Sequence, residues 1–123
     1  MKEEIILMLV QYQIQIKFMH WQTFGDAKHR AYGQLYDFLN EAIDEFVETM
    51  MGKYERPIFP PEFPLTFQDF NSMDAEAFCE GFADYLISFT DRMNPKLDSD
   101  LLNQRDEMLG ELNRIKYLLT LKY

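Results

Sequence analysis

The chain has 123 residues, which suits one domain with a single hydrophobic core. Apolar residues make up 47% of it and aromatic residues 15%, so we expect a folded protein. The formal net charge of −9 argues against unaided binding to nucleic acid or to an anionic membrane, because such surfaces require clustered Lys and Arg. An acidic chain can still attract cations, including metal ions.

Three features of the sequence indicate its cellular compartment. Met1-Lys2-Glu3-Glu4 does not resemble the start of a signal peptide, and no uncharged apolar run reaches transmembrane length. The single Cys79 excludes an intrachain disulfide. We therefore expect a soluble, cytoplasmic protein with no membrane partner.

The first expected helix covers about residues 3–23 and carries apolar side chains on two opposite sides. A four-helix monomer buries only one side of a helix well, so the other side indicates a subunit interface. Residues 10–18 also alternate like a strand, but the length of the segment favours a helix. The two stripes are Leu7, Val10, Ile14, Phe18 and Trp21, and Ile5, Leu9, Tyr12, Ile16 and Met19.

The second expected helix covers about residues 27–51, with Asp26 as its N-cap and Gly52 as its stop. His29 falls in its first turn, where the positive end of the helix disfavours protonation and keeps the imidazole available as a ligand. The buried stripe steps by three and four residues through His29, Tyr32, Tyr36, Leu39, Ile43, Phe46 and Met50.

Residues 53–71 contain four of the five prolines and are expected to be extended. At about 3 Å per residue this segment covers more than ~40 Å, whereas the preceding helix is only ~36 Å long at about 1.5 Å per residue. The segment can therefore cross a bundle from end to end. We expect its aromatic residues to anchor it to the bundle, although a partner-binding strip is the alternative. These residues are Phe59, Phe63, Phe67 and Phe70.

Two further helices are expected at about residues 72–92 and 99–121, separated by Asn94-Pro95. Phe78, Phe82, Tyr85, Leu86 and Phe89 would form the buried face of the third helix. Residues 1–123 are thus predicted to form one all-α domain. Its architecture would be a ferritin-like four-helix bundle with one long crossover between the second and third helices.

Two histidines and two acidic residues form the candidate metal site. Asp44 and Glu48 are spaced i,i+4 and share one helix face, where Asp37 and Glu41 extend an acidic ridge. The alternative is that these carboxylates form an ordinary solvated helix face with no ligand. His29 and Asp44 lie roughly 22 Å apart along a helix, so one chain cannot hold one ion with both. Two copies packed antiparallel about a two-fold axis could join them.

The segment from His20-Trp21 through His29 and Leu35-Tyr36-Asp37 to residues 41–48 resembles the ferroxidase segment of the Dps-type miniferritins. The resemblance covers residues 18–48, about a quarter of the chain. It implies iron sites across a dimer two-fold axis. His20 and His29 would be ligands from one subunit, with Asp44 and Glu48 from its partner. Trp21 would lie beside the site and quench oxidising equivalents; an ordinary core position is the equal alternative.

Three departures from the resembled pattern matter. The turn between the histidines is three residues shorter than in the family, and the acid expected four residues after His29 is Gly33. The loss of that carboxylate weakens the expectation of two metal ions and of ferroxidase turnover. The chain also lacks the Lys-rich terminal extension with which some members bind DNA, and the charge opposes a role in DNA protection.

The sequence therefore predicts a homodimer, with a larger cage as an option, that binds iron or alternatively zinc or manganese. Oxidation of ferrous iron would follow from the resemblance. The alternative is a metal-free helical dimer acting as an interaction or scaffold protein. An intrachain di-metal bundle is excluded, because it needs further histidines and none follows His29.

Overall fold

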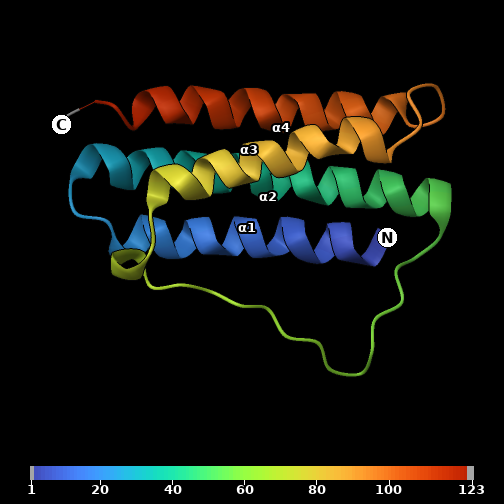
Figure 1. Ribbon diagram of the computed structural model, residues 1–123, viewed down its shortest axis with the longest axis horizontal. Coiled ribbons are helices and arrows are strands. Elements are labelled where there is room, and N and C mark those ends of the chain that lie inside the picture. The colour runs from blue at the N-terminus through green and yellow to red at the C-terminus, as the bar shows by residue number, and fades with distance from the viewer. Residues whose placement is uncertain (1, 122–123) are drawn as a thin grey trace.

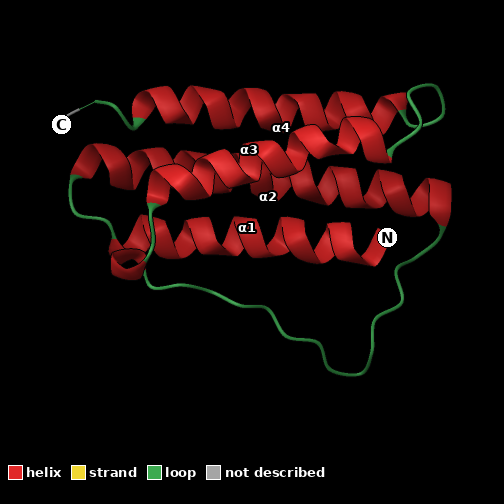
Figure 2. Cartoon of the chain, in the orientation of Figure 1, coloured by secondary structure: helices red, strands yellow, loops and turns green. Residues whose placement is uncertain are grey.

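A computed structural model describes residues 2–121, which form four α-helices and one short 3-10 helix, with no strand in that range. The expected all-α four-helix architecture is confirmed (Figure 2). The strand alternative for residues 10–18 is wrong, because they lie inside the first helix. Between residues 2 and 121, no helix is both long and apolar enough to cross a membrane. The elements are α1 (Lys2–Gln22), α2 (Asp26–Tyr54), η1 (Phe70–Ser72), α3 (Ala75–Arg92) and α4 (Ser99–Leu118).

The order of the helices in space follows from the long segment between α2 and α3 (Figure 1). α1 and α2 form an antiparallel hairpin joined by a short turn. The crossover then runs back along the bundle beside α1, so α3 has the same direction as α2, and α4 returns antiparallel to α3. α2 packs against both α1 and α4, and α3 packs against α4.

The two apolar stripes of α1 have different environments. The stripe from Ile5 to Met19 faces the core, where Leu9, Ile16 and Met19 are fully buried and Tyr12 stacks on Phe82 with ring centroids 4.4 Å apart. Complete burial of one such side chain contributes about 1.5–3 kcal/mol. In the opposite stripe, residues 7, 10, 14 and 18 are half-buried, and Trp21 is 61% exposed. The described chain leaves this side of α1 only partly covered.

The expected stripes of α2 and α3 lie where the periodicity places them, except that the predicted burial of His29 is wrong because the first turn of α2 is open to solvent. In α2, Tyr32, Leu39, Ile43, Phe46 and Met50 are buried, Tyr36 is half-buried and His29 is exposed. In α3, Phe82, Leu86 and Phe89 are buried, and Phe78 and Tyr85 are half-buried against the core.

Several predicted helix ends are wrong. Gly25, with a φ of 100°, is the residue before α2, and Asp26 is its first residue, ion-paired with Arg30. α2 continues through Gly52 and ends at Tyr54, and the next residue, Glu55, has a φ of 80°.

The other two corrections concern α3 and α4. Residues 71 and 72 belong to η1, and α3 begins later, at Ala75. The carboxylate of Asp74 caps α3 by accepting a hydrogen bond from the backbone N–H of Ala77, a role that the sequence pattern did not single out. α4 ends at Leu118, three residues before the expected end.

The continuation of α2 past Gly52 has a physical cause in α1. The Lys2 ammonium donates hydrogen bonds to the carbonyls of Tyr54, Glu55 and Arg56. Carbonyls at the end of a helix lack partners within the helix, and a cation there also interacts favourably with the helix dipole. The stop predicted at Gly52 is therefore displaced by a contact that comes from another element.

Glutamine side chains of α1 hold the crossover in place. The Gln15 side chain accepts from the backbone N–H of Gln68 at 2.8 Å and donates to its carbonyl at 2.9 Å. Gln11 accepts from the N–H of Thr66, and Gln22 from that of Phe70. These bonds satisfy backbone groups of an extended segment that has no neighbouring strand.

The crossover aromatics mostly anchor it, as expected. Phe59 and Phe70 pack against the core, and Phe67 lies against Phe18. Phe63 stacks on Phe59 with centroids 4.6 Å apart and stays 43% exposed. The segment is thus attached to α1 by both polar and aromatic contacts.

Candidate metal centre

The turn between α1 and α2 brings His20 and His29 into contact. His20 lies in the last turn of α1 and His29 in the first turn of α2. Their rings stack with centroids 3.8 Å apart and planes 20° apart. Nδ1 of His20 lies 2.6 Å from the His29 carbonyl oxygen, and Nδ1 of His29 lies 2.7 Å from the His20 carbonyl oxygen. We call these two residues the imidazole pair.

The reciprocal hydrogen bonds fix the tautomer of both rings. A carbonyl oxygen can only accept a hydrogen bond, so each Nδ1 must carry its proton and donate it. In the neutral rings, each Nε2 then keeps its lone pair. Histidines that bind metals commonly use this arrangement, with the other ring N–H donated to a carbonyl or carboxylate. The imidazole pair therefore has the donor atoms and the orienting contacts of metal ligands.

Gly33 lies against the ring of His20. A Cβ atom built at Gly33 would be 2.9 Å from Cε1 of His20 and 3.0 Å from its Nδ1. Those distances are shorter than a van der Waals contact between a methyl group and a ring. The ring of His20 therefore occupies the space in which a carboxylate side chain at residue 33 would begin.

Trp21 is not a core residue of this chain, since 61% of it is exposed. It meets Phe18 edge to face with centroids 5.8 Å apart. The Lys17 ammonium lies 5.4 Å from the centroid of the Trp21 ring and 4.6 Å from that of Tyr36. This places a cation between α1 and α2 on the exposed side of the hairpin, in cation–π contact with both rings. No motif in the sequence pointed to Lys17.

Asp44 and Glu48 lie further along α2, and both are exposed. A hydrogen bond to Asp44 and the repulsion between the two carboxylates raise the pKa of Glu48 above its ordinary value. Asp44 also lines a shallow groove between α1 and α2, together with Val10, Asn40 and Val47. The two carboxylates are therefore neighbours that open onto the surface.

Within one chain, the imidazole pair and the two carboxylates stay apart. The imidazole pair lies at the start of α2, and the two carboxylates lie further along the same helix. Fifteen helical positions separate His29 from Asp44, roughly 22 Å at about 1.5 Å per residue. Among residues 2–121, no three His, Cys, Asp or Glu side chains lie close enough to hold a metal ion. The structure joins His20 to His29 and Asp44 to Glu48, and leaves the two pairs separate.

Four carboxylates form a continuous acidic ridge along α2. Asp37, Glu41, Asp44 and Glu48 are all exposed and follow steps of four, three and four residues. Seven carboxylates elsewhere in the bundle have a cationic partner within ion-pair distance, whereas the described part of the chain provides none for these four. At the start of the same helix, Arg30 is ion-paired with Asp26, and Lys28 adds a further positive charge. The start of α2 is therefore net positive and the ridge is negative.

Comparison with protein-family models matches residues 20–119 to a family of unknown function, DUF5856. The chain belongs to this family. The part shared with DUF5856 begins at His20 and contains His29, Gly33, Asp44 and Glu48. No curated protein and no solved structure gives a significant match.

Proposed function

We propose that this DUF5856 protein binds metal ions at a site shared by two subunits. The imidazole pair of one subunit would meet Asp44 and Glu48 of its partner. The observation that carries the proposal is the pair of reciprocal hydrogen bonds between His20 and His29, since they orient both rings and leave both Nε2 atoms for a ligand.

The charge distribution of α2 supports an antiparallel pairing of two copies. If residue 29 of one copy lies opposite residue 44 of the other, the two-fold axis passes near residues 36 and 37. Lys28 at the start of each α2 then lies near the acidic residues of its partner, a complementary contact at each end of the interface, while the two copies of Asp37 lie near the axis. The same pairing would cover the half-buried stripe of α1 that contains Val10 and Ile14.

The donor set supports a particular group of metals. Two imidazole nitrogens and two carboxylate oxygens suit ferrous iron, zinc or manganese. Ferrous iron would be the substrate, and its oxidation to ferric iron requires peroxide or oxygen as the electron acceptor. In this proposal the protein acts in the cytoplasm, where a lone thiol such as Cys79 stays reduced.

Subunit complementation tests the shared site. Zn²⁺ binding is measured by calorimetry for the wild type, His29→Ala, Asp44→Ala and the control Asp84→Ala, which changes an exposed acid on α3. We expect both site variants to lose binding and the control to retain it. After the two site variants are unfolded and refolded together, random pairing restores about a quarter of the wild-type sites, because each mixed dimer contains one intact site.

The results that would contradict the proposal are equally specific. Wild-type protein that leaves Zn²⁺ and ferrous iron unbound at millimolar concentration would exclude a metal site. Binding that is lost in both variants and stays absent from the refolded mixture would exclude a site shared between subunits.

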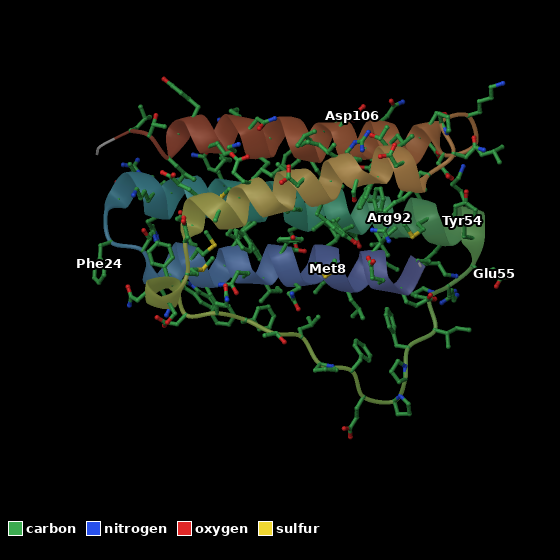
Figure 3. The ribbon with its side chains drawn as sticks, viewed as in Figure 1. Met8, Phe24, Tyr54, Glu55, Arg92 and Asp106 are labelled. Atoms are coloured by element: carbon green, nitrogen blue, oxygen red, sulfur yellow. The ribbon has the colours of Figure 1, made fainter. Side chains whose placement is uncertain are left out.

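A metal-free helical dimer acting as a scaffold is the second candidate. Exposed aromatic residues around the α1–α2 turn favour it, because Trp21 is 61% and Phe24 is 86% exposed. Figure 3 shows Phe24 at this turn, pointing away from the bundle. A dimer with full stability and empty sites would support this candidate over metal binding.

A further inference from the structure

We infer that Gly33 is the positioning residue of the imidazole pair, and that its missing side chain restricts each shared site to one metal ion. The first part rests on the contacts of Gly33 with His20. The second part also rests on the proposed metal-binding function. Gly33 touches no metal in this proposal and acts only through the ring of His20.

Glycine is an unfavourable residue at this position unless a contact requires it. Gly33 lies inside α2, where glycine is the least favourable residue apart from proline. Gly52, Gly81 and Gly110 also lie in helices, and a Cβ built on any of them meets no atom within 4 Å. Only at Gly33 among these four does an added Cβ meet another side chain at 2.9 Å.

The ring of His20 can move away from a new side chain only by losing its present contacts. It stacks on His29, and its Nδ1 donates to the His29 carbonyl. A Cβ at residue 33 would press on Cε1 and Nδ1, the edge of the ring that makes this hydrogen bond. Because the clash is with a movable side chain, the helix itself does not have to change. An added methyl group should therefore displace the imidazole and leave the fold intact.

The same contact determines how many metal ions the site can hold. A carboxylate at residue 33 and the ring of His20 in its present place exclude each other. Within one subunit, the half-site then consists of two neutral imidazoles with no carboxylate four residues after His29. With Asp44 and Glu48 of the partner, this gives two nitrogen ligands and two carboxylates, enough for one ion of the zinc or ferrous type.

Gly33→Ala and Gly110→Ala form a matched pair for the test. Both replace a helical glycine by alanine, so both should gain helix stability. Nitrogen-15 NMR of the imidazoles, recorded above the pH at which histidine titrates, reports which ring nitrogen carries the proton. We expect two Nδ1–H imidazoles in the wild type and in Gly110→Ala, and loss of the His20 signal pattern in Gly33→Ala. Thermal melting should show both variants folded.

A double variant separates positioning from ordinary packing. In a His20→Ala background the clash is gone, so Gly33→Ala should give the same rise in melting temperature as Gly110→Ala. In the wild-type background its rise should be smaller. Equal rises in both backgrounds, with the His20 signals unchanged, would overturn the positioning role.

Zn²⁺ titration then tests the single-ion site. We expect one ion per subunit for the wild type and at least a tenfold weaker affinity for Gly33→Ala, with Gly110→Ala unchanged. Two ions per subunit in the wild type would overturn the single-ion inference. If the wild type binds no Zn²⁺ and the NMR of Gly33→Ala still changes as expected, the proposed function fails while the positioning role of Gly33 stands.

Discussion

The closed end of the bundle and the exposed side of the α1–α2 hairpin differ in how their polar and charged groups are paired. At the closed end, formed by Lys2, Glu4, Tyr54, Arg92 and Asp98, the polar groups are paired within the chain. Arg92 and the hydroxyl of Tyr85 both donate to Glu4, and the hydroxyl of Tyr54 donates to Asp98. Tyr54 and Arg92 lie at the same end of the bundle, opposite Phe24 (Figure 3).

On the exposed side of the α1–α2 hairpin, polar groups remain available. The acidic ridge has no ion-pair partner within the described part of the chain, and the imidazole pair uses only one nitrogen of each ring. Charges paired inside a chain stabilise its fold, whereas like charges left together oppose it. The closed end therefore contributes to the stability of the fold, and the unpaired groups of the hairpin side are the ones that the proposed metal site and second copy would use.

Two aspartate substitutions, one in each region, should differ most in their effect on the free energy of unfolding. Asp98 is 6% exposed and accepts from Tyr54 and from the backbone N–H of Asn94, so Asp98→Ala should lower the free energy of unfolding by about 2–3 kcal/mol. Asp44→Ala should change it by less than about 0.5 kcal/mol, because Asp44 is exposed. Urea unfolding of dilute protein measures both values. Similar losses in the two variants would contradict the assignment of the two regions.

The crossover side of α1 should resemble the closed end. Gln15→Leu removes a side chain that bonds both the N–H and the carbonyl of Gln68, and should lower the free energy of unfolding by about 2 kcal/mol. Gln11→Leu, which removes one bond to Thr66, should have about half that effect. Hydrogen exchange of the Gln68 amide gives a local measurement. Its rate should rise in Gln15→Leu and stay low in Gln11→Leu.

These glutamines also show what sequence periodicity cannot reveal. The helices were predictable because apolar residues such as Leu39, Ile43 and Phe46 repeat with the helical period and are buried in the core. Gln11 and Gln15 follow the same period, but their partner is an extended segment more than fifty positions away with no period of its own. The predicted stop at Gly52 was wrong for the same reason, since Lys2 stabilises the end of α2 from another element.

The candidate site likewise has features that the sequence predicts and features that it does not. The family resemblance implied that His20 and His29 of one subunit act together, and the structure brings their rings into contact despite the shortened turn. The reciprocal hydrogen bonds and the contact of His20 with Gly33 depend on the orientation of single rings, which residue spacing does not define. The pairing of two chains is a property of an assembly, and it stays a prediction here.

Cys79 tests whether the difference between buried, paired groups and exposed, available groups follows the ends of the bundle or its inner and outer faces. It lies near the turn end, yet it is only 2% exposed, and burial raises the pKa of its thiol to about 11. The folded state thus favours the neutral thiol. Its stabilising contribution is complete below pH 9 and is lost as the pH rises towards 11.

The corresponding measurement is the pH dependence of unfolding. In Cys79→Ala, the decline in stability above pH 9 should be shallower than in the wild type, by on the order of 1 kcal/mol. The slope is compared, and not the absolute stability, because the smaller side chain also leaves a cavity. If the wild type and Cys79→Ala lose stability equally steeply above pH 9, the inner face of the bundle near the α1–α2 turn is accessible to water. The difference between paired and available groups would then follow the ends of the bundle.

Lys17 provides the most sensitive test of the hairpin side. It lies against Tyr36, close to where an antiparallel pairing places the two-fold axis, and it would face Asp37 of the second copy. Lys17→Met keeps the length of the side chain and removes its charge, so the fold should be unaffected. We expect the dimer to be weakened by about 0.5–1 kcal/mol, a two- to fivefold rise in Kd. Sedimentation at low ionic strength measures this change.

Three further variants show whether the Lys17 result reports contact between two chains. Lys96→Met removes an exposed cation from the loop before α4 and should leave the dimer unchanged. Lys17→Asp should weaken the dimer more than Lys17→Met, because it adds a like charge to the acidic ridge, and combining it with Asp37→Lys should restore association. Because Lys17 lies against Tyr36, next to Asp37, within one chain, the decisive form of this test mixes Lys17→Asp chains with Asp37→Lys chains. Association between the two variants that is tighter than that of either variant alone would require the two positions to meet across the interface. A combined variant that associates no better than Lys17→Asp alone would exclude the antiparallel register, and with it the meeting of the imidazole pair with Asp44 and Glu48.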